Sequence, residues 1–135
     1  MATKSMLKTV TIKTKTMGVS LADALEICDT FADGELDLIV SNPPYIKSAD
    51  IETLQKEVRL EPRLALDGGE DGCDFYREIV SRWSRKLKKG GALAFELGEN
   101  QADAVKALMT DKGFSDFKIS LDFGGVQRAI IGTLL

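Results

Sequence analysis

The sequence predicts an α/β fold with parallel strands, and three stretches of the chain indicate it. A short apolar run from Leu36 to Val40 is typical of a buried strand, and it ends abruptly in a polar residue and two prolines. A second apolar run, Ala92 to Leu97, is continuous, as expected for a strand that is covered on both faces of a parallel sheet. Between these runs, residues Asp74 to Lys89 have the spacing of an amphipathic helix.

The first part of the chain has the weakest pattern, so we separate residues 1–35, an arm or partial element, from residues 36–135. The stretch Leu7–Lys15 is rich in threonine and lysine and could be an ordered edge strand or an added arm. Further along, Ser20 is placed to cap a short helix over Leu21–Ile27.

The middle of the chain is expected to form a small helix and a loop. Residues Asp50 to Arg59 have apolar side chains close to helical spacing, at Ile51, Leu54 and Val58. The segment Gly68–Gly72 is expected to be a turn-rich loop rather than a phosphate-binding loop. It contains an acidic pair and lacks the strand, loop and helix context of a phosphate site.

The clearest helix is predicted over Asp74–Lys89, ending at Gly90 and Gly91. Its apolar residues recur about every fourth position and indicate packing against the core: Phe75, Ile79, Val80, Trp83 and Leu87. Basic residues gather in its later turns, where they complement the helix dipole.

After the second apolar run, the pattern predicts a helix and then a hairpin. Asn100 is expected to cap a helix through Lys112, with Gly113 as the residue that ends it. A strand with alternating apolar residues should follow, then a turn at 122–125 and a final antiparallel strand over Gln127–Leu134. The alternating residues are Phe117, Ile119 and Leu121.

The loop after the first apolar run carries the chemistry. Pro43 and Pro44 fix their own φ angles and restrict the residue before each, so that Asn42 and Pro43 form a stiff pair of acceptors. The side-chain carbonyl of Asn42 and the backbone carbonyl of Pro43 suit the two hydrogens of an NH2 group. Tyr45 could stack on a planar target group and exclude water.

Such a pair of acceptors offers catalysis by orientation. The lone pair of an amide or ring-attached nitrogen is delocalised, and gripping both hydrogens could aim it at an electrophilic carbon. The sequence has no histidine, which agrees with a mechanism that needs no strong base. The alternative is an ordinary strand followed by a Pro-Pro turn with an incidental asparagine and tyrosine.

The segment Asn42–Tyr45 resembles the NPPY motif of S-adenosylmethionine-dependent amino-methyltransferases, which act on base amines or glutamine amides. The residues that follow are similar to the HemK/PrmC family of protein-glutamine N5-methyltransferases, which modify the Gly-Gly-Gln loop of peptide-chain release factors. The similar stretches are Glu61–Gly72, Phe75–Arg77, Gly90–Gly91, Phe95–Gly98, Gln101 and Arg128. The resemblance covers about the last hundred residues.

This resemblance implies a Rossmann-like class I methyltransferase fold, truncated to the carboxyl-terminal half of its sheet, with an antiparallel last strand. It implies Asn42, Pro43 and Tyr45 as catalytic residues, and these three with Pro44 as the substrate-binding loop. It also implies S-adenosylmethionine as cofactor and a release factor as protein substrate. The turn Asp29–Phe31 resembles one that lies beside the adenine in the family, so Asp29, Phe31 and Asn42 are the candidate cofactor residues. A capped turn with a buried phenylalanine is an equal alternative.

Two other functions remain open from the sequence. The Gly-rich turn that holds the methionine moiety in the family has no counterpart before Asp37, so the chain could be a non-catalytic module that binds a release factor or a partner subunit. A base-directed amino-methyltransferase would use the same loop, but the segment after it favours glutamine.

Without the family's first strand, an apolar edge beside Leu36–Val40 needs a cover. Either Leu7–Lys15 adds as a substitute strand or two chains pair there as a homo-oligomer.

Two charged residues have open roles. Glu96 falls near the carboxyl end of its strand, where open α/β sheets bind ligands, and we expect it to orient the loop rather than to transfer protons. Arg128 could be a surface charge at a sheet edge or a group that orients the site.

Composition narrows the classes of partner. The net charge of −3 gives no electrostatic footprint for nucleic acid, and a protein substrate is favoured. Cys28 and Cys73 lack metal-site spacing, so we expect free thiols and no metal. No apolar run is long enough to span a membrane and no signal peptide is present, so a cytoplasmic location is expected.

Overall fold

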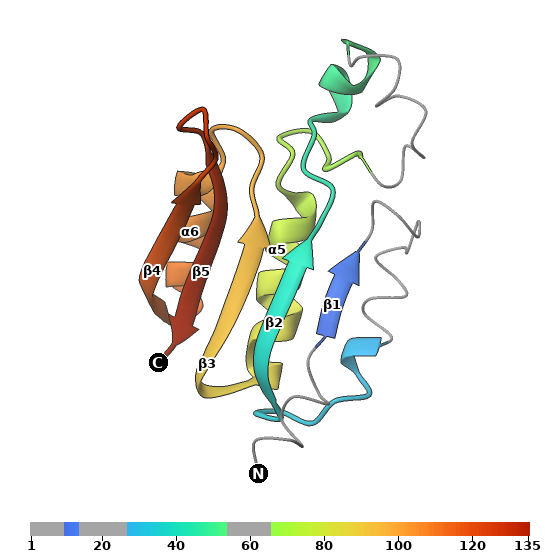
Figure 1. Cartoon of the computed structure of the whole chain (residues 1–135). Helices are drawn as coiled ribbons and strands as arrows, with labels where there is room; N and C mark the ends of the chain where they lie inside the picture. Colours follow the sequence, from blue (N-terminus) through green and yellow to red (C-terminus); the bar gives the residue numbers. More distant parts are fainter. Residues whose placement is uncertain (1–9, 14–26, 54–65) are drawn as a thin grey trace.

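The computed structural model describes residues 10–13, 27–53 and 66–135. These residues form a five-stranded sheet in the order β1-β2-β3-β5-β4 (Figure 1). The first three strands run parallel, and β5 is antiparallel to both β3 and β4. The strands are β1 (Val10–Lys13), β2 (Leu36–Asn42), β3 (Leu87–Glu96), β4 (Phe114–Leu121) and β5 (Gln127–Leu134). The helices are α5 (Asp74–Trp83), α6 (Ala102–Asp111) and the 3-10 helices η1 (Ser48–Thr53) and η3 (Ser84–Lys86).

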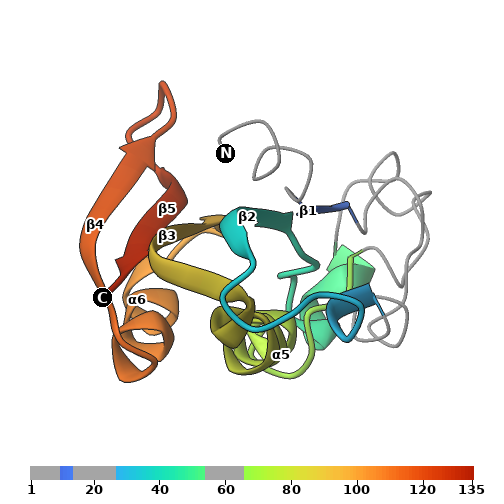
Figure 2. The same cartoon turned by 90° about the horizontal axis from the view of Figure 1, so that it is seen from below.

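Both α-helices lie on one face of the sheet, and the hydrophobic core lies between them and the strands (Figure 2). Trp83 and Tyr76 of α5 are completely buried, and the Tyr76 ring meets Phe95 of β3 edge-on with centroids 5.1 Å apart. The apolar stripe predicted for the helix is therefore confirmed as core packing. Among the described residues, no helix is long and apolar enough to cross a membrane.

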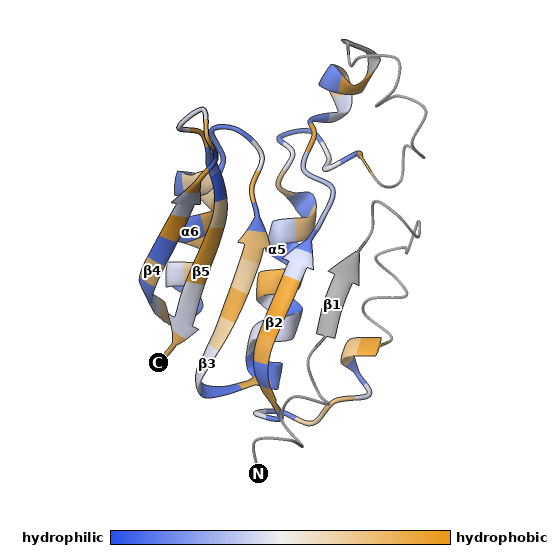
Figure 3. Ribbon diagram, in the orientation of Figure 1, coloured by the Kyte–Doolittle hydropathy of each residue, from blue (hydrophilic) through white to orange (hydrophobic). Residues whose placement is uncertain are grey.

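The opposite face of the sheet is less covered than we predicted. Along β3, Leu93 and Phe95 are buried, whereas their neighbours Ala92 and Ala94 are half-buried. Ala92 pairs with Leu38 and Ala94 with Val40 of β2, so that the half-buried apolar residues form rows across the sheet. Figure 3 shows the apolar residues that run along β2, β3 and β5. The expectation that this strand is covered on both faces is wrong for the described part of the chain, because both described α-helices lie on the same side.

The edge of β2 is covered by β1. Val10–Lys13 pairs in parallel with Ile39–Asn42, which confirms four residues of the substitute strand that we expected within Leu7–Lys15. The chain thereby supplies its own partner for this edge, and the pairing of two chains remains a prediction without support.

The predicted helix Asp74–Lys89 is too long by six residues. The α-helix ends at Trp83, a 3-10 turn follows, and β3 already begins at Leu87, which pairs with Leu36. Lys86 is only 5% exposed and donates from Nζ to the Phe31 carbonyl at 2.6 Å. This bond ties the 3-10 turn to the segment before β2. A buried leucine satisfies both a helix stripe and a strand, so spacing alone did not separate them.

The start of α6 also differs from the prediction. Asn100 has a φ of +64° and lies in an exposed turn, and Gln101 occupies the N-cap position without a side-chain capping bond. The helix end is as predicted: Lys112 is the C-cap and Gly113 follows with a φ of +95°.

Three further expectations touch residues outside the described ranges. The helix predicted over residues 50–59 is present as η1, Ser48–Thr53, with Ile51 buried, and its remainder lies outside the described residues. The Ser20-capped helix also lies outside them, except for its end at Ile27 and the next residue, which form a helical turn. The similar stretch from Glu61 is described only from Leu66 onward.

The predicted hairpin is confirmed. β4 and β5 are antiparallel and are joined by a turn in which Asp122 Oδ1 accepts from the N–H groups of Gly124 and Val126, at 2.8 and 3.0 Å. The alternation in β4 is interrupted at Asp116, which has a φ of +53° beside a shift in register. Leu121 is 60% exposed, so the apolar face of the strand ends before it.

Candidate functional site

The Asn42–Tyr45 loop leaves the carboxyl end of β2, as predicted. Pro43 is completely buried and Pro44 is buried, so the two prolines form the floor of the loop rather than its surface. The Oδ1 atom of Asn42 is shielded from solvent. A short apolar strand and two buried prolines thus hold the acceptor-bearing residues in a fixed position.

A second loop, which begins at Leu66, packs against the Asn42–Tyr45 loop and the residue after it. Ile46 pairs in parallel with Asp67, its N–H donates to the Leu66 carbonyl at 3.1 Å, and its own carbonyl accepts from the Gly68 N–H at 2.7 Å. A Cβ atom on Gly68 would lie 2.7 Å from the Tyr45 Cα and 2.9 Å from the Pro44 carbonyl oxygen. Only glycine permits this close approach of two backbones. The glycine-rich segment is therefore a support for the loop.

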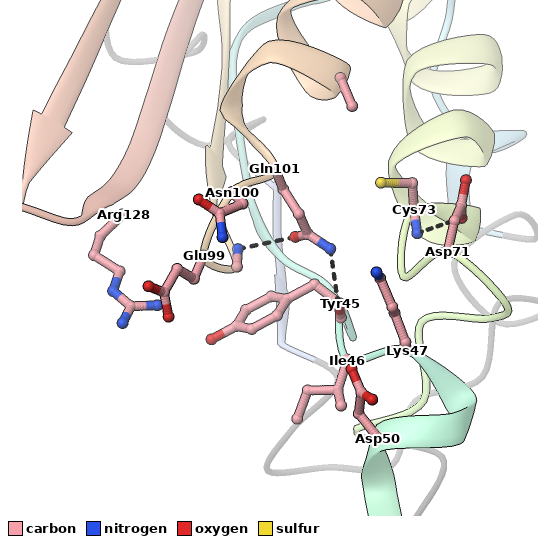
Figure 4. Close-up of a pocket in the computed structure, with 12 residues that line it drawn as sticks. Tyr45, Ile46, Lys47, Asp50, Asp71, Cys73, Glu99, Asn100, Gln101 and Arg128 are labelled. Carbon is pink, nitrogen blue, oxygen red and sulfur yellow. Dashed lines mark hydrogen bonds between the residues drawn. The ribbon is translucent and has the colours of Figure 1, made fainter.

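Gln101, at the start of α6, joins the Asn42–Tyr45 loop to the turn after β3. Its Nε2 donates to the Tyr45 carbonyl at 2.8 Å, and its Oε1 accepts from the Gly98 N–H at 3.0 Å (Figure 4). Gly98 allows the contact, because a Cβ there would lie 2.5 Å from Oε1 and 2.7 Å from the Tyr45 ring.

The Tyr45 ring is held at its far end by Glu96. The Tyr45 hydroxyl donates to Glu96 Oε1 at 3.2 Å, and the Tyr76 hydroxyl donates to the Glu96 carbonyl at 2.7 Å. These bonds fit the orienting role that we predicted for Glu96. Burial raises the pKa of Tyr76 far above its usual range, so this hydroxyl remains a donor at any physiological pH.

Beside the Tyr45 ring lies a cavity of about 710 Å³. It opens between the loop, the turn after β3 and the β4–β5 hairpin (Figure 4). Its lining residues are Tyr45, Ile46, Lys47, Asp50, Asp71, Cys73, Gly98, Glu99, Asn100, Gln101, Ala104 and Arg128. The volume is that of a small-molecule or side-chain site.

Two charged residues of this cavity pair with side chains outside its lining. Asp71 accepts from the Cys73 N–H at 2.9 Å and pairs with Arg77, and both interactions lower the Asp71 pKa. Arg128 lines the cavity and donates from Nε to Asp122 Oδ2 at 3.1 Å. Because β5 lies between β3 and β4, Arg128 is not at a sheet edge, and of its two predicted roles the structure favours the one at the site.

The candidate cofactor residues are not brought together. Asp29 and Phe31 precede β2 and lie at its amino end, where the Phe31 ring packs on Trp83 with centroids 6.0 Å apart. Asn42 lies at the opposite end of the strand, about 20 Å away for seven extended residues. The alternative of a packed phenylalanine is therefore what the structure shows for Phe31.

The sequence did not single out the residues that hold the loop in place. In the sequence, Gln101 stands out only through the family resemblance, and no local pattern connects the glycines at 68, 72 and 98 with Tyr45. The signals that could have found them are the group of glycines just before the predicted helix and the single Gly98 just after the second apolar run.

Comparison with known proteins gives a consistent assignment. No family model matches the chain. It is 49% identical over 107 residues to the release factor glutamine methyltransferase of Geobacter sulfurreducens, covering 78% of this chain and 38% of that protein. It is 47% identical over 97 residues to the enzyme of the same name from Caulobacter vibrioides, covering 71% and 34%.

A solved structure agrees with these relatives. The release factor-specific protein-(glutamine-N5) methyltransferase from Alicyclobacillus acidocaldarius matches with a TM-score of 0.53 and 27% identity, over 87% of this chain and 61% of that one. The fold is therefore a truncated Rossmann-like methyltransferase fold. The chain spans between 34% and 38% of the length of the two curated relatives. By sequence and fold, the chain belongs to the release factor glutamine methyltransferase family and corresponds to the carboxyl-terminal part of its members.

Proposed function

We propose that the Asn42–Tyr45 loop is the amide-binding half of a protein-glutamine N-methyltransferase site. The observation that carries this proposal is the rigid support of the loop. Buried prolines, backbone contacts with Gly68 and the Gln101 amide hold it at the end of β2, beside a cavity of about 710 Å³. A family of glutamine methyltransferases provides the substrate class.

In this proposal, the loop acts on the amide by orientation. The Asn42 side-chain carbonyl and the Pro43 backbone carbonyl each accept one hydrogen of the substrate NH2 group. Holding both hydrogens fixes the plane of the amide and turns the nitrogen lone pair in one direction. The Tyr45 ring packs against the amide and is itself held by Glu96.

The donor implied by the family resemblance is S-adenosylmethionine, whose sulfonium would supply the methyl group and leave as a neutral thioether, while the amide nitrogen would lose one proton to water. Of the three residues predicted for it, only Asn42 belongs to the loop at the carboxyl end of β2; Asp29 and Phe31 lie at the other end of the strand, and none of the three lines the cavity itself. Within the described residues, the structure therefore supports the substrate side of the reaction. The protein substrate proposed is a peptide-chain release factor, which presents a glutamine on a loop.

The placement of Asp29 and Phe31 favours a second candidate function. Since the described residues present the amide-binding half and do not place Asp29 and Phe31 beside it, the chain could bind a release factor, or a partner subunit, without modifying it. A module that binds a release factor still needs the loop to recognise a glutamine, and it differs from the enzyme only in whether a methyl group is transferred.

Mass spectrometry of a Gly-Gly-Gln peptide incubated with the chain and S-adenosylmethionine tests the proposal. We expect one methyl group on the glutamine, and Asn42→Ala should slow its appearance by about 100-fold, the usual effect of removing one positioning hydrogen bond. Gln127→Ala, on an exposed residue outside the cavity, is the control and should keep the parent rate. Equal rates for Asn42→Ala and the parent would refute the role of Asn42. No transfer with retained peptide binding would favour the binding module.

A further inference from the structure

Gln101 is buried at the centre of the site, although the proposed reaction gives it no role. Its side chain is 9% exposed, so its polar atoms must find partners within the protein. The two short bonds are those to the Tyr45 carbonyl and the Gly98 N–H, at 2.8 and 3.0 Å. Nε2 also lies 3.4 Å from the Gly72 carbonyl, and Oε1 lies 3.3 Å from the Tyr76 hydroxyl.

The surroundings determine which way the amide points. Two carbonyl oxygens, of Tyr45 and Gly72, face Nε2, whereas an N–H group faces Oε1. Exchanging the two ends would place Oε1 against two acceptors and Nε2 against a donor. Position 101 therefore needs both a donor and an acceptor, which glutamine provides without a change of protonation and an ionised glutamate does not.

The same side chain joins three loops that are far apart in sequence. Tyr45 follows β2, Gly72 precedes α5 and Gly98 follows β3. A Cβ atom at Gly72 would lie 2.7 Å from Nε2, and one at Gly98 would lie 2.5 Å from Oε1, so both glycines leave room only for this amide. Losing the amide would leave the Tyr45 carbonyl without this donor, and the Ile46 backbone bonds would be its nearest remaining support.

We propose that Gln101 is the positioning residue of the site: its amide holds the Tyr45 backbone, and thereby keeps the ring and the acceptors before it in one orientation. Its role in methyl transfer rests on the proposed function, whereas its hold on the loop does not. Gln101 touches no reacting atom and acts through Tyr45.

Two substitutions separate its bonds. Gln101→Glu keeps the shape of the side chain and the acceptor for the Gly98 N–H. When ionised, it lacks the donor for the Tyr45 carbonyl, and its carboxylate faces the Tyr45 and Gly72 carbonyls. Gln101→Met keeps the volume and loses both bonds. Gln127→Glu makes the same chemical change on an exposed residue and is the matched control.

Hydrogen exchange followed by NMR reads the loop without any need for activity. The amides of Ile46 and Gly68 bond across the two supported loops, and we expect both to exchange at least about 10-fold faster in the two Gln101 variants. The Leu97 amide, which bonds to the Arg128 carbonyl at 2.8 Å, reports on the sheet and should be unchanged. Parent-like exchange at Ile46 and Gly68 in both variants would overturn the proposal.

Kinetics with a Gly-Gly-Gln peptide and S-adenosylmethionine give the second readout. For a parent that transfers methyl, Gln101→Glu should lower kcat by about 100-fold with a much smaller change in KM, because misplacement affects the reacting geometry. A loosened loop with the parent's kcat would also overturn the positioning role. A parent without transfer would contradict the proposed function, while the exchange experiment would still decide whether Gln101 holds the loop.

Discussion

Replacing Gly68 with alanine tests how tightly the loop is supported. The added Cβ would meet the Gly72 carbonyl oxygen at 2.6 Å, the Tyr45 Cα at 2.7 Å and the Pro44 carbonyl oxygen at 2.9 Å. All three neighbours are backbone atoms, so no side chain can turn away and one of the loops must move. Overpacking of this kind costs about 1–3 kcal/mol.

Urea unfolding, followed by the fluorescence of the single tryptophan, measures this cost. Trp83 is 1% exposed in the core, so its emission reports on global unfolding. We expect a lower midpoint for Gly68→Ala, or faster exchange of the Ile46 amide if the strain is confined to the loop. Gly124→Ala is the control. Its Cβ would meet only the tip of the exposed Asp122 side chain, at 3.3 Å, and we expect a change within about 0.5 kcal/mol. Gly68→Ala with both parent-like stability and parent-like exchange would refute the close approach of the two backbones.

Three further predictions follow from buried or paired groups. Burial raises the pKa of Cys28, which is 1% exposed, so in a Cys73→Ser variant this thiol should not react with a disulfide reagent at pH 8 until the chain unfolds, which absorbance can follow; a fast reaction of native protein would contradict its burial. The Asp122 pKa is lowered, first by the backbone N–H of Val126 and then by Arg128. The Asp122 carboxylate should therefore stabilise the folded state above about pH 4, and this stabilisation should be lost as the pH falls through the pKa of the folded protein. In an acid titration followed by unfolding, Asp122→Asn should lack this pH-dependent loss of stability. Lys86→Met leaves a loop carbonyl without its charged donor and should lower the free energy of unfolding by about 1–3 kcal/mol in urea; an unchanged midpoint would show that the bond contributes nothing.

Local patterns predicted the strands and the hairpin well, because each depends on residues close in sequence. The apolar run beside two prolines specifies both the end of β2 and the loop after it. The helix prediction failed at its end, where Leu87 continued the apolar spacing although it belongs to β3. The competing preference came from a distant contact, the bond from Lys86 to Phe31, which lies 55 residues away.

The support of the site could not be predicted for the same reason. Gln101 and Tyr45 are 56 residues apart, and nothing in the local pattern distinguishes a buried glutamine in a turn from an exposed one. The placement of Phe31 was open for a related reason: a phenylalanine in a turn fits both a cofactor pocket and a packed core, and only its contact with Trp83 decides between them.

The proposed role of the loop at the end of β2 is to bind the primary amide of a glutamine. NMR titration with an acetylated Gly-Gly-Gln peptide measures this binding, which needs neither the cofactor nor turnover. We predict saturable shifts of the Tyr45 and Ile46 amide signals, weaker shifts with the Gly-Gly-Glu peptide, and none in Asn42→Ala. Equal shifts with both peptides, or shifts that persist unchanged in Asn42→Ala, would contradict this role.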